Sequence, residues 1–279
     1  MRVAVFSGKG GTGKTMVSVN LAAVSRSAVY VDCDVEEPNG HLYFKPDGVV
    51  RETVTVLVPR ADPERCDGCL ECVRFCRFHA LSYSLDRLMV FDDVCHSCGG
   101  CSVVCPREAI SEHERGIGTV DTGRSGDVVV HTGTMDIGEA IGLPIIGRLL
   151  EKASAEDDDV FIDCPPGSSC MAMESIKDAD FCILVSEPTV FGAHNLGMVA
   201  ELARVFGKPV GAVLNKVIEG EEDPSERFCI ENGIPILARI PFDLELGRLC
   251  SEATIASWAD TGYERMFRDL LERITEAVG

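Results

Sequence analysis

The stretch Ser7-Gly8-Lys9-Gly10-Gly11-Thr12-Gly13-Lys14-Thr15 decides the fold of this 279-residue chain. It follows a short apolar run and opens a helix-forming segment, which is the context that the pattern GxxxxGK[ST] requires. Its glycines let consecutive backbone N–H groups face phosphate oxygens, Lys14 pairs with the outer phosphates, and the Thr15 hydroxyl binds magnesium. The stretch therefore predicts a nucleotide phosphate-binding loop; the alternative is a glycine-rich turn with an incidental lysine.

The rest of the chain alternates short apolar runs with helix-forming segments. Parallel sheets with helices on both faces show this alternation, and their ligands bind beyond the carboxyl ends of the strands. The expected fold is an α/β P-loop NTPase with a doubly wound, mostly parallel sheet. The expected strands are 2–6, 28–31, 128–131, 160–162, 181–185, 211–214 and 236–240, and the expected helices are 14–25, 138–152, 168–177, 193–206 and 224–232.

Lys9 follows the first glycine of the loop, at a position that the general pattern leaves open. With it, residues 9–15 read KGGTGKT, which resembles the deviant Walker A loop of the MinD/ParA superfamily of P-loop ATPases, relatives of the nitrogenase iron protein. The resemblance implies that Lys9 reaches the partner's phosphates across a nucleotide-sandwiched homodimer; a solvated surface lysine is the alternative. The residues expected to bind ATP and Mg²⁺ are Gly8, Lys9, Gly10, Gly11, Thr12, Gly13, Lys14, Thr15, Asp163, Gly167, Asn215 and Pro241.

Two later segments resemble the switch regions of the same superfamily. In the first, residues 31–39, the resemblance makes Asp34 the carboxylate that orients the attacking water. In the second, residues 163–167, it makes Asp163 the Walker B carboxylate near magnesium and Gly167 the glycine that senses the γ-phosphate. A carboxylate after a buried strand is also a common helix cap. The resemblance covers residues 1–45 and 115–279 and implies an ATPase with Lys9, Lys14 and Asp34 as its catalytic residues, while Asn215 and Pro241 match the positions that hold adenine.

The most specific pattern is a repeated run of cysteines. Residues 66–81 superpose on residues 95–110 with all eight cysteines aligned, and both copies have the C-x₂-C-x₂-C-x₃-C spacing of bacterial ferredoxins. This spacing predicts two 4Fe-4S clusters; zinc sites more often use two CxxC pairs separated by a longer loop. Because the fourth cysteine of each run binds the other cluster in two-cluster ferredoxins, the expected ligand sets are Cys66, Cys69, Cys72 and Cys105 for one cluster, and Cys95, Cys98, Cys101 and Cys76 for the other.

The cysteine runs predict a small inserted domain. We expect a ferredoxin-like α+β domain at residues 61–112, inserted into an ATPase domain formed by residues 1–60 and 113–279. A core of this size needs ligation to be stable. Arg77 stands where a proline is expected after Cys76, a change that alters the surroundings of the second cluster without removing a ligand.

Six further cysteines lie outside the two runs. Cys33, Cys182, Cys229 and Cys250 lie in apolar surroundings and are expected to be core residues. Cys164 and Cys170 flank the second switch segment. Cysteines near this switch hold a shared cluster or metal across the two-fold axis in related dimeric ATPases, so Cys170 is a candidate bridging metal ligand.

Composition excludes several classes of protein. The formal net charge of −19 opposes capture by nucleic acid, and no segment has the roughly 18 apolar residues of a membrane-spanning helix. Neither a signal peptide nor a basic amphipathic helix is evident; the stripe at 263–278 has a mixed polar face and is expected to pack on the fold. We therefore expect a cytoplasmic protein without stable membrane insertion, in which 14 cysteines indicate metal or redox chemistry.

Three functions are compatible with these patterns. The first couples ATP hydrolysis in a dimer to the assembly or transfer of an iron-sulfur or related metal cofactor, with an apo metalloprotein as acceptor. The second is an ATP-gated electron donor to a redox partner enzyme. The third, a positioning ATPase with a redox sensor, is disfavoured because no DNA-binding or membrane-binding surface is evident. The cysteine beside the switch favours the first modestly, whereas two clusters on one chain suit the second.

Overall fold

The first strand and the loop after it lie near the centre of a nine-stranded sheet in the computed structural model, which describes residues 1–279. The strand order is β11-β10-β9-β1-β8-β2-β7-β6-β3. From β11 to β7 the pairs are parallel. The strands are β1 (Arg2–Phe6), β2 (Ala28–Asp32), β3 (Asp47–Ala61), β6 (Ile110–Ser125), β7 (Val128–Met135), β8 (Asp159–Asp163), β9 (Phe181–Ser186), β10 (Val210–Val217) and β11 (Ile236–Pro241), with β4 (Leu81–Ser84) and β5 (Arg87–Val90) in a separate antiparallel pair.

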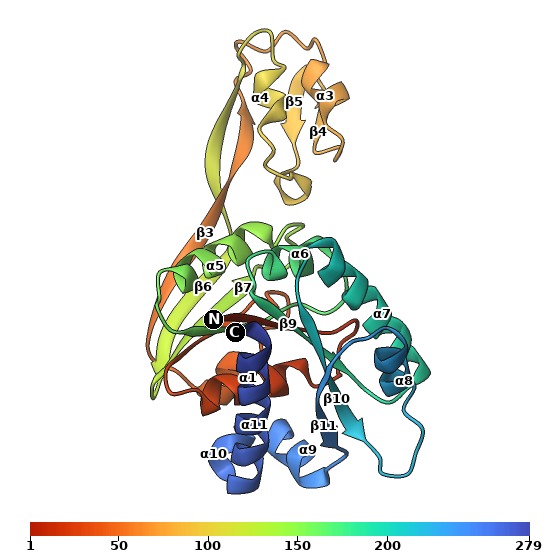
Figure 1. Ribbon diagram of the computed structural model, residues 1–279. Helices are drawn as coiled ribbons and strands as arrows, with labels where there is room; N and C mark the ends of the chain where they lie inside the picture. Colours follow the sequence, from red (N-terminus) through yellow and green to blue (C-terminus); the bar gives the residue numbers. More distant parts are fainter. The chain divides into compact units, whose positions relative to one another are not determined.

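Helices cover both faces of the sheet, as the alternating pattern predicts (Figure 1). On one face α1 packs against α10 and α11, and on the other face α7 packs against α8 and β9 (Figure 1). The helices are α1 (Lys14–Val24), α2 (Gly40–Phe44), α3 (Glu71–Phe75), α4 (Gly100–Val103), α5 (Leu143–Ser154), α6 (Cys170–Ile176), α7 (Val190–Val205), α8 (Pro224–Glu231), α9 (Leu244–Ser251), α10 (Ala256–Ala259) and α11 (Thr261–Val278), with a 3₁₀ turn at Asp92–Val94. The prediction of an α/β fold with a mostly parallel central sheet is confirmed.

Every expected strand lies in this sheet, but several elements differ from the prediction. Helix α5 begins at Leu143 instead of residue 138, and α7 begins at Val190, three residues early, because the Thr189 side chain caps it by accepting from Gly192 N at 2.8 Å. The long strands β3 and β6 and the short helix α9 were not expected. β3 was missed because most of its residues are exposed. β6 was missed because its buried residues are scattered among exposed and half-buried ones, so neither strand forms a buried apolar run.

Helix α11 packs on the sheet domain through one apolar face. Phe267, Leu270 and Ile274 are buried in the same cluster as α1 and β1 residues. This confirms that the amphipathic stripe near the C-terminus packs on the fold. None of the helices has the length and apolar character needed to cross a bilayer.

The chain divides into two compact units. The first, called here the sheet unit, comprises Met1–Arg51, Val120–Thr134 and Ile146–Gly279; the second, the cysteine unit, comprises Glu52–Thr119 and Met135–Ile145. The cysteine unit contains the whole of the expected insert at 61–112 and is wider than it. The extra residues are 52–60 of β3, 113–119 of β6, and 135–145, which follow most of β7. Arg115 of β6 pairs with Glu139 of the last segment.

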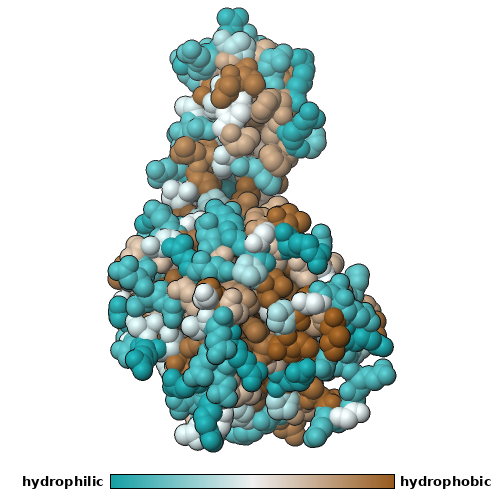
Figure 2. Space-filling model, in the orientation of Figure 1, coloured by the Kyte–Doolittle hydropathy of each residue, from teal (hydrophilic) through white to brown (hydrophobic).

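The cysteine unit has little regular structure. It holds the β4–β5 hairpin and the short helices α3 and α4, which lie against each other. Its buried cluster consists of Cys72, Leu81, Cys101 and Ile110. Apolar side chains are visible on its surface in Figure 2; Leu85 and Val103 are among its exposed residues.

Candidate nucleotide site and cysteine cavities

The last residue of the loop after β1 has a backbone conformation and a close neighbour that only glycine can accommodate. Gly13 has φ 96° and precedes α1, and a Cβ atom built there would lie 2.2 Å from Nδ2 of Asn215. The same Nδ2 donates to the Thr12 carbonyl oxygen at 2.7 Å. Asn215, expected at the adenine, therefore also holds the backbone of the loop, across 203 positions of sequence.

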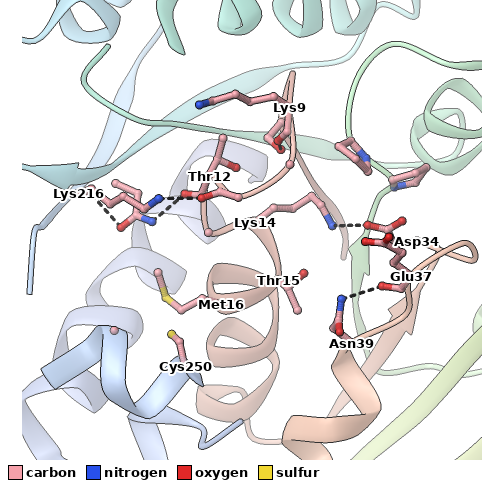
Figure 3. Close-up of a pocket in the computed structure, with 18 of the residues that line it drawn as sticks. Lys9, Thr12, Lys14, Thr15, Met16, Asp34, Glu37, Asn39, Lys216 and Cys250 are labelled. Carbon is pink, nitrogen blue, oxygen red and sulfur yellow. Dashed lines mark hydrogen bonds and ion pairs between the residues drawn. The ribbon is translucent and has the colours of Figure 1, made fainter. Parts of the chain in front are cut away.

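The loop borders a large pocket of the sheet unit (Figure 3). Its walls come from the carboxyl ends of β1 and β2, from the segment after β8, and from the ends of β10 and β11. The expected site residues that line it are Lys9, Gly10, Gly11, Thr12, Gly13, Lys14, Thr15, Asp34, Asn215 and Pro241. Carboxylate, hydroxyl, lysine and backbone groups thus face one cavity, and the apolar residues Met16, Phe242 and Leu246 extend it on one side.

Three expected site residues do not line the pocket. Gly8 approaches the α7 backbone so closely that a Cβ atom there would lie 2.4 Å from the Asn195 carbonyl oxygen. Asp163 is buried, 1% exposed, beneath Lys14. Gly167 has φ 83°, and its N–H donates to the Ser7 carbonyl oxygen at 2.8 Å, which ties the second switch segment to the start of the loop.

Lys14 is buried among carboxylates at the floor of the pocket. Its Nζ lies 2.5 Å from Oδ1 of Asp163. It also lies 3.7 Å from Oδ2 of Asp34, the ion pair that Figure 3 shows. Burial lowers the pKa of Lys14, but Asp163 and Asp34 outweigh it and the net shift is upward. Burial raises the pKa of Asp34, with Lys14 opposing the shift. The lysine is therefore a firmly charged cation at the position where a phosphate would compete with Asp163 for it.

Asp32 is a second buried carboxylate that the sequence prediction missed. It is fully buried at the end of β2, and its oxygens accept from the backbone N–H groups of Asp34, Asn39 and Gly40 at 2.8–3.2 Å. Burial, reinforced by nearby Asp163, raises the pKa of Asp32 to about 8. The acidic residue that ends the apolar run at 28–31 was the available signal. Asp32 holds the first switch segment in shape.

Lys9 is not free in the single chain. Its Nζ pairs with Oε1 of Glu187, and Lys216 lies 3.4 Å from Oε2 of the same carboxylate while donating to the Gly11 carbonyl oxygen at 2.8 Å. Burial raises the pKa of Glu187, but the two lysines outweigh it and lower the pKa overall. Glu187 and Lys216 are functional candidates that sequence reasoning did not assign.

The cysteine unit contains two cavities, each lined by four of the eight cysteines. One has about 350 Å³ of empty space, partly open to solvent, and the other about 370 Å³. Cys66, Cys69, Cys72 and Cys105 line the first, and Cys95, Cys98, Cys101 and Cys76 line the second. In each cavity three cysteines come from one run and the fourth comes from the other, the same division as in the crossed ligand sets predicted above.

Backbone N–H groups point at two of these sulfurs. Ser97 N lies 3.4 Å from Sγ of Cys95, and Ala109 N lies 3.3 Å from Sγ of Cys105. No group of three or more His, Cys, Asp or Glu side chains is arranged to hold a single metal ion. The N–H contacts suit sulfurs that carry negative charge.

The remaining cysteines differ in burial. Cys33, Cys164, Cys182 and Cys229 are buried, Cys250 is half-buried, and Cys170 is exposed at the first turn of α6. Burial raises the pKa of the Cys33, Cys164 and Cys182 thiols, which keeps them protonated and unreactive. Cys170 is the most accessible of the six, and its metal role stays a prediction.

Comparisons with known proteins agree with this geometry. Residues 3–254 match the family described as the CobQ/CobB/MinD/ParA nucleotide binding domain. Two uncharacterized proteins of Methanocaldococcus jannaschii are similar: MJ0578, 26% identical over 100% of this chain and 98% of its own length, and MJ0579, 26% identical over 77% and 80%.

Solved structures with the same fold include cell-division proteins. The septum site-determining protein MinD of Pyrococcus horikoshii, complexed with Mg-ADP, has a TM-score of 0.61 at 20% identity and covers 100% of this chain and 97% of its own. McdA of Cyanothece, without nucleotide, has a TM-score of 0.59 at 14% identity and covers 100% of this chain and 99% of its own. Since the family match covers most of the chain, this protein belongs to the CobQ/CobB/MinD/ParA nucleotide-binding family.

Proposed function

We propose that this chain is an ATPase that couples a nucleotide-driven dimer switch to the assembly or transfer of an iron-sulfur or related metal cofactor. The observation that carries the proposal is that one chain holds both a phosphate-loop pocket and two cavities lined by four cysteines each. A nucleotide-binding fold alone supports only an ATPase. The cysteine cavities add a metal-cluster site to the same polypeptide.

The pocket supplies groups for ATP hydrolysis. Glycine N–H groups of the loop face the phosphates, Lys14 neutralises their charge, and Asp34 orients the attacking water. The Thr15 hydroxyl and the carboxylates of Asp34 and Asp163 are the oxygen donors that Mg²⁺ prefers. When bound, the metal ion neutralises developing charge on the phosphates. The apolar side of the pocket, with Asn215 and Pro241, accepts the adenine.

Lys9 is proposed to act in the dimer. In the single chain it is held by Glu187, so crossing to a partner's phosphates exchanges one anionic partner for another. Such an exchange makes the dimer depend on bound nucleotide, because Lys9 gives up its ion pair with Glu187 only when a phosphate of the partner lies within its reach. Release of the two switch segments after hydrolysis would then open the dimer.

The two cavities fit 4Fe-4S clusters better than zinc. Four thiolates around one cavity are the ligand set of a cubane, and the donated N–H groups stabilise its sulfurs. A cubane is larger than an ion, so its four thiolates stand farther apart than those of a zinc site. Bound clusters would supply one-electron chemistry and join the two cysteine runs covalently.

Electron donation is the second candidate function. Two clusters in one small unit provide a path for electrons, and the half-buried and exposed cysteines, Cys98 among them, bring that path to the surface. In this reading, nucleotide binding controls docking to a redox enzyme. A positioning ATPase has less support because the acidic chain offers no DNA-binding surface.

An anaerobic reconstitution experiment tests the proposal. The clusters are rebuilt with iron and sulfide, Mg-ATP is added, and two quantities are followed: transfer of iron to an apo ferredoxin, and the reduction potential of the clusters. ATP-dependent transfer with an unchanged potential is expected. Reduction of an acceptor without loss of iron supports the electron donor instead, and absence of both effects contradicts the coupling.

Two variants make the test specific. Lys14→Ala removes the phosphate contact and should abolish ATP-dependent transfer while the iron content is retained. Lys177→Ala removes a lysine that is exposed at the end of α6 and pairs with Glu174, so it should behave as the wild type. Equal transfer by both variants would show that nucleotide does not drive the process.

A further inference from the structure

A buried tyrosine contacts the Walker B carboxylate from the side opposite Lys14. The hydroxyl of Tyr30, in β2, donates to Oδ2 of Asp163 at 3.0 Å, while Lys14 holds Oδ1 at 2.5 Å. Tyr30 and Asp163 are both nearly inaccessible to solvent, at 0% and 1%. Since no water reaches this oxygen from bulk solvent, the hydroxyl is its hydrogen-bond donor.

The tyrosine is held in place by tight packing. Its ring contacts Phe44 of α2, with centroids 5.0 Å apart, and Phe44 in turn meets Trp258 edge-on at 6.0 Å. The first residue of α2 is Gly40, and a Cβ atom there would lie 2.2 Å from Cε1 of Tyr30 and 2.3 Å from its hydroxyl. The glycine therefore leaves the space that the phenol occupies. A tyrosine with so few alternative positions is a rigid donor.

The two bonds to Asp163 respond differently to nucleotide. Lys14 lies at the floor of the phosphate pocket and is drawn to the phosphates, so its bond to Oδ1 is weakened when nucleotide binds. Tyr30 does not line the pocket, and no phosphate competes for its hydroxyl. When nucleotide binds, Oδ1 of Asp163 is thus free to face a magnesium ion, while Oδ2 stays bonded to the Tyr30 hydroxyl.

We propose that Tyr30 is a positioning residue that holds the Asp163 carboxylate in the orientation required for magnesium when Lys14 has moved to the phosphates. The inference rests on the proposed nucleotide function. It predicts that the hydroxyl contributes to the metal-dependent part of nucleotide binding and little to the metal-free part. The rate of hydrolysis should fall with the loss of metal binding, because the carboxylate becomes free to rotate.

Tyr30→Phe tests the proposal by removing only the hydroxyl. Nucleotide affinity is measured by calorimetry with ATP and with ADP, each in excess Mg²⁺ and in EDTA. We expect the affinity in Mg²⁺ to fall about tenfold, the effect of one hydrogen bond to a charged group, and the affinity in EDTA to change less than about twofold. The hydrolysis rate should drop, and raising the Mg²⁺ concentration should restore part of it.

Ser154→Ala is the control. Its hydroxyl donates to the Leu150 carbonyl oxygen in α5 at 2.7 Å and does not line the pocket, so the control loses one hydroxyl hydrogen bond away from Asp163. Gly40→Ala is a second test variant: it keeps the hydroxyl but displaces the ring, and should give the same metal-selective loss. Thermal unfolding of each variant separates lost stability from lost metal binding.

The outcomes distinguish this inference from the function on which it rests. If the wild type shows no Mg²⁺-dependent nucleotide binding, the nucleotide function fails and the inference fails with it. If the wild type does, but Tyr30→Phe loses affinity equally in Mg²⁺ and EDTA, or loses none, then Tyr30 is only a packing residue and the inference is wrong.

Discussion

The sheet unit and the cysteine unit stabilise themselves by different means. In the sheet unit, β1 and α1 contribute to a buried cluster of aliphatic and aromatic residues that continues through β9 and α11. The buried cluster of the cysteine unit has four members, and two of them, Cys72 and Cys101, are cysteines. Burial of apolar surface maintains the first unit. The second has a core too small for this, so under the proposed function it depends on ligation.

This difference predicts which side-chain substitutions each unit tolerates. The parallel sheet positions its site residues through backbone pairing, so loss of one side chain from the pocket leaves the fold intact. In the cysteine unit the expected ligands also belong to the core, so loss of one ligand is a loss of structure. The two units should therefore fail separately, and four experiments test this separation.

The largest effect is expected from Lys14→Ala. The lysine is the buried cation of the phosphate pocket, and its loss should lower the hydrolysis rate by about a thousandfold or more because the phosphate charge is no longer neutralised. Steady-state phosphate release measures the rate, and iron analysis of the same preparation should show full content. A parallel loss of iron would break the comparison by showing that the units are interdependent.

A smaller effect, about 2 kcal/mol, is expected from the pH dependence of the sheet unit. Burial lowers the pKa of His131, in β7, to about 4, below its usual 6.5; its Nδ1 bonds Thr122 Oγ1 at 2.9 Å while Nε2 has no partner. Because the unfolded chain binds the proton more readily, stability is lost as the pH falls through 6.5 toward 4. Between pH 7 and 5 the wild type should lose about 2 kcal/mol from this group.

Denaturant unfolding at several pH values measures this loss. The variant His131→Gln should show a shallower decline, and the difference between the two curves isolates the histidine from the carboxylates that titrate at lower pH. Identical slopes would contradict the assignment. The absorbance of clusters reconstituted as proposed above, followed in the same titration, reports whether the cysteine unit opens with the sheet unit or apart from it.

Glu187→Gln should strengthen the ATP-dependent dimer about threefold, the size of one partly exposed ion pair. The carboxylate holds Lys9 within its own chain, so its removal frees the lysine for the partner's phosphates. Analytical ultracentrifugation with a non-hydrolysable ATP analogue gives the dissociation constant. Glu201→Gln, which breaks an exposed pair with Arg204 on α7, is the control; a weaker dimer in Glu187→Gln would rule out competition for Lys9.

The smallest fold-change is expected from Cys105→Ser. This substitution disrupts one of the two four-cysteine sets, so the iron content should fall by about half. The hydrolysis rate should be nearly unchanged. Cys66→Ser should give the same residual electron paramagnetic resonance spectrum, since both line one cavity, whereas Cys76→Ser should give the other. Matching spectra for Cys105→Ser and Cys95→Ser would instead indicate uncrossed ligand sets. Cys229→Ser, in the sheet unit's core, is the control.

Local pattern alone was sufficient for much of this protein. Residues 7–15 predicted a phosphate loop between a strand and a helix, because the glycines and the lysine act through the backbone of a few consecutive residues. The alternation of apolar runs predicted the parallel sheet, since each buried strand carries its own signal. The cysteine spacing likewise predicted two sites from residues close in sequence.

Only the tertiary structure decided which distant groups meet. The pairs Lys9–Glu187 and Tyr30–Asp163 join residues 178 and 133 positions apart. They meet because strand order brings β1, β2, β8 and β9 side by side, and strand order depends on how all the faces of the sheet are buried at once. β3 and β6 went unpredicted because neither contains a continuous run of buried apolar residues. The sequence by itself thus determined the chemical groups and the local loops that present them, whereas long-range packing decided which of those groups share a cavity.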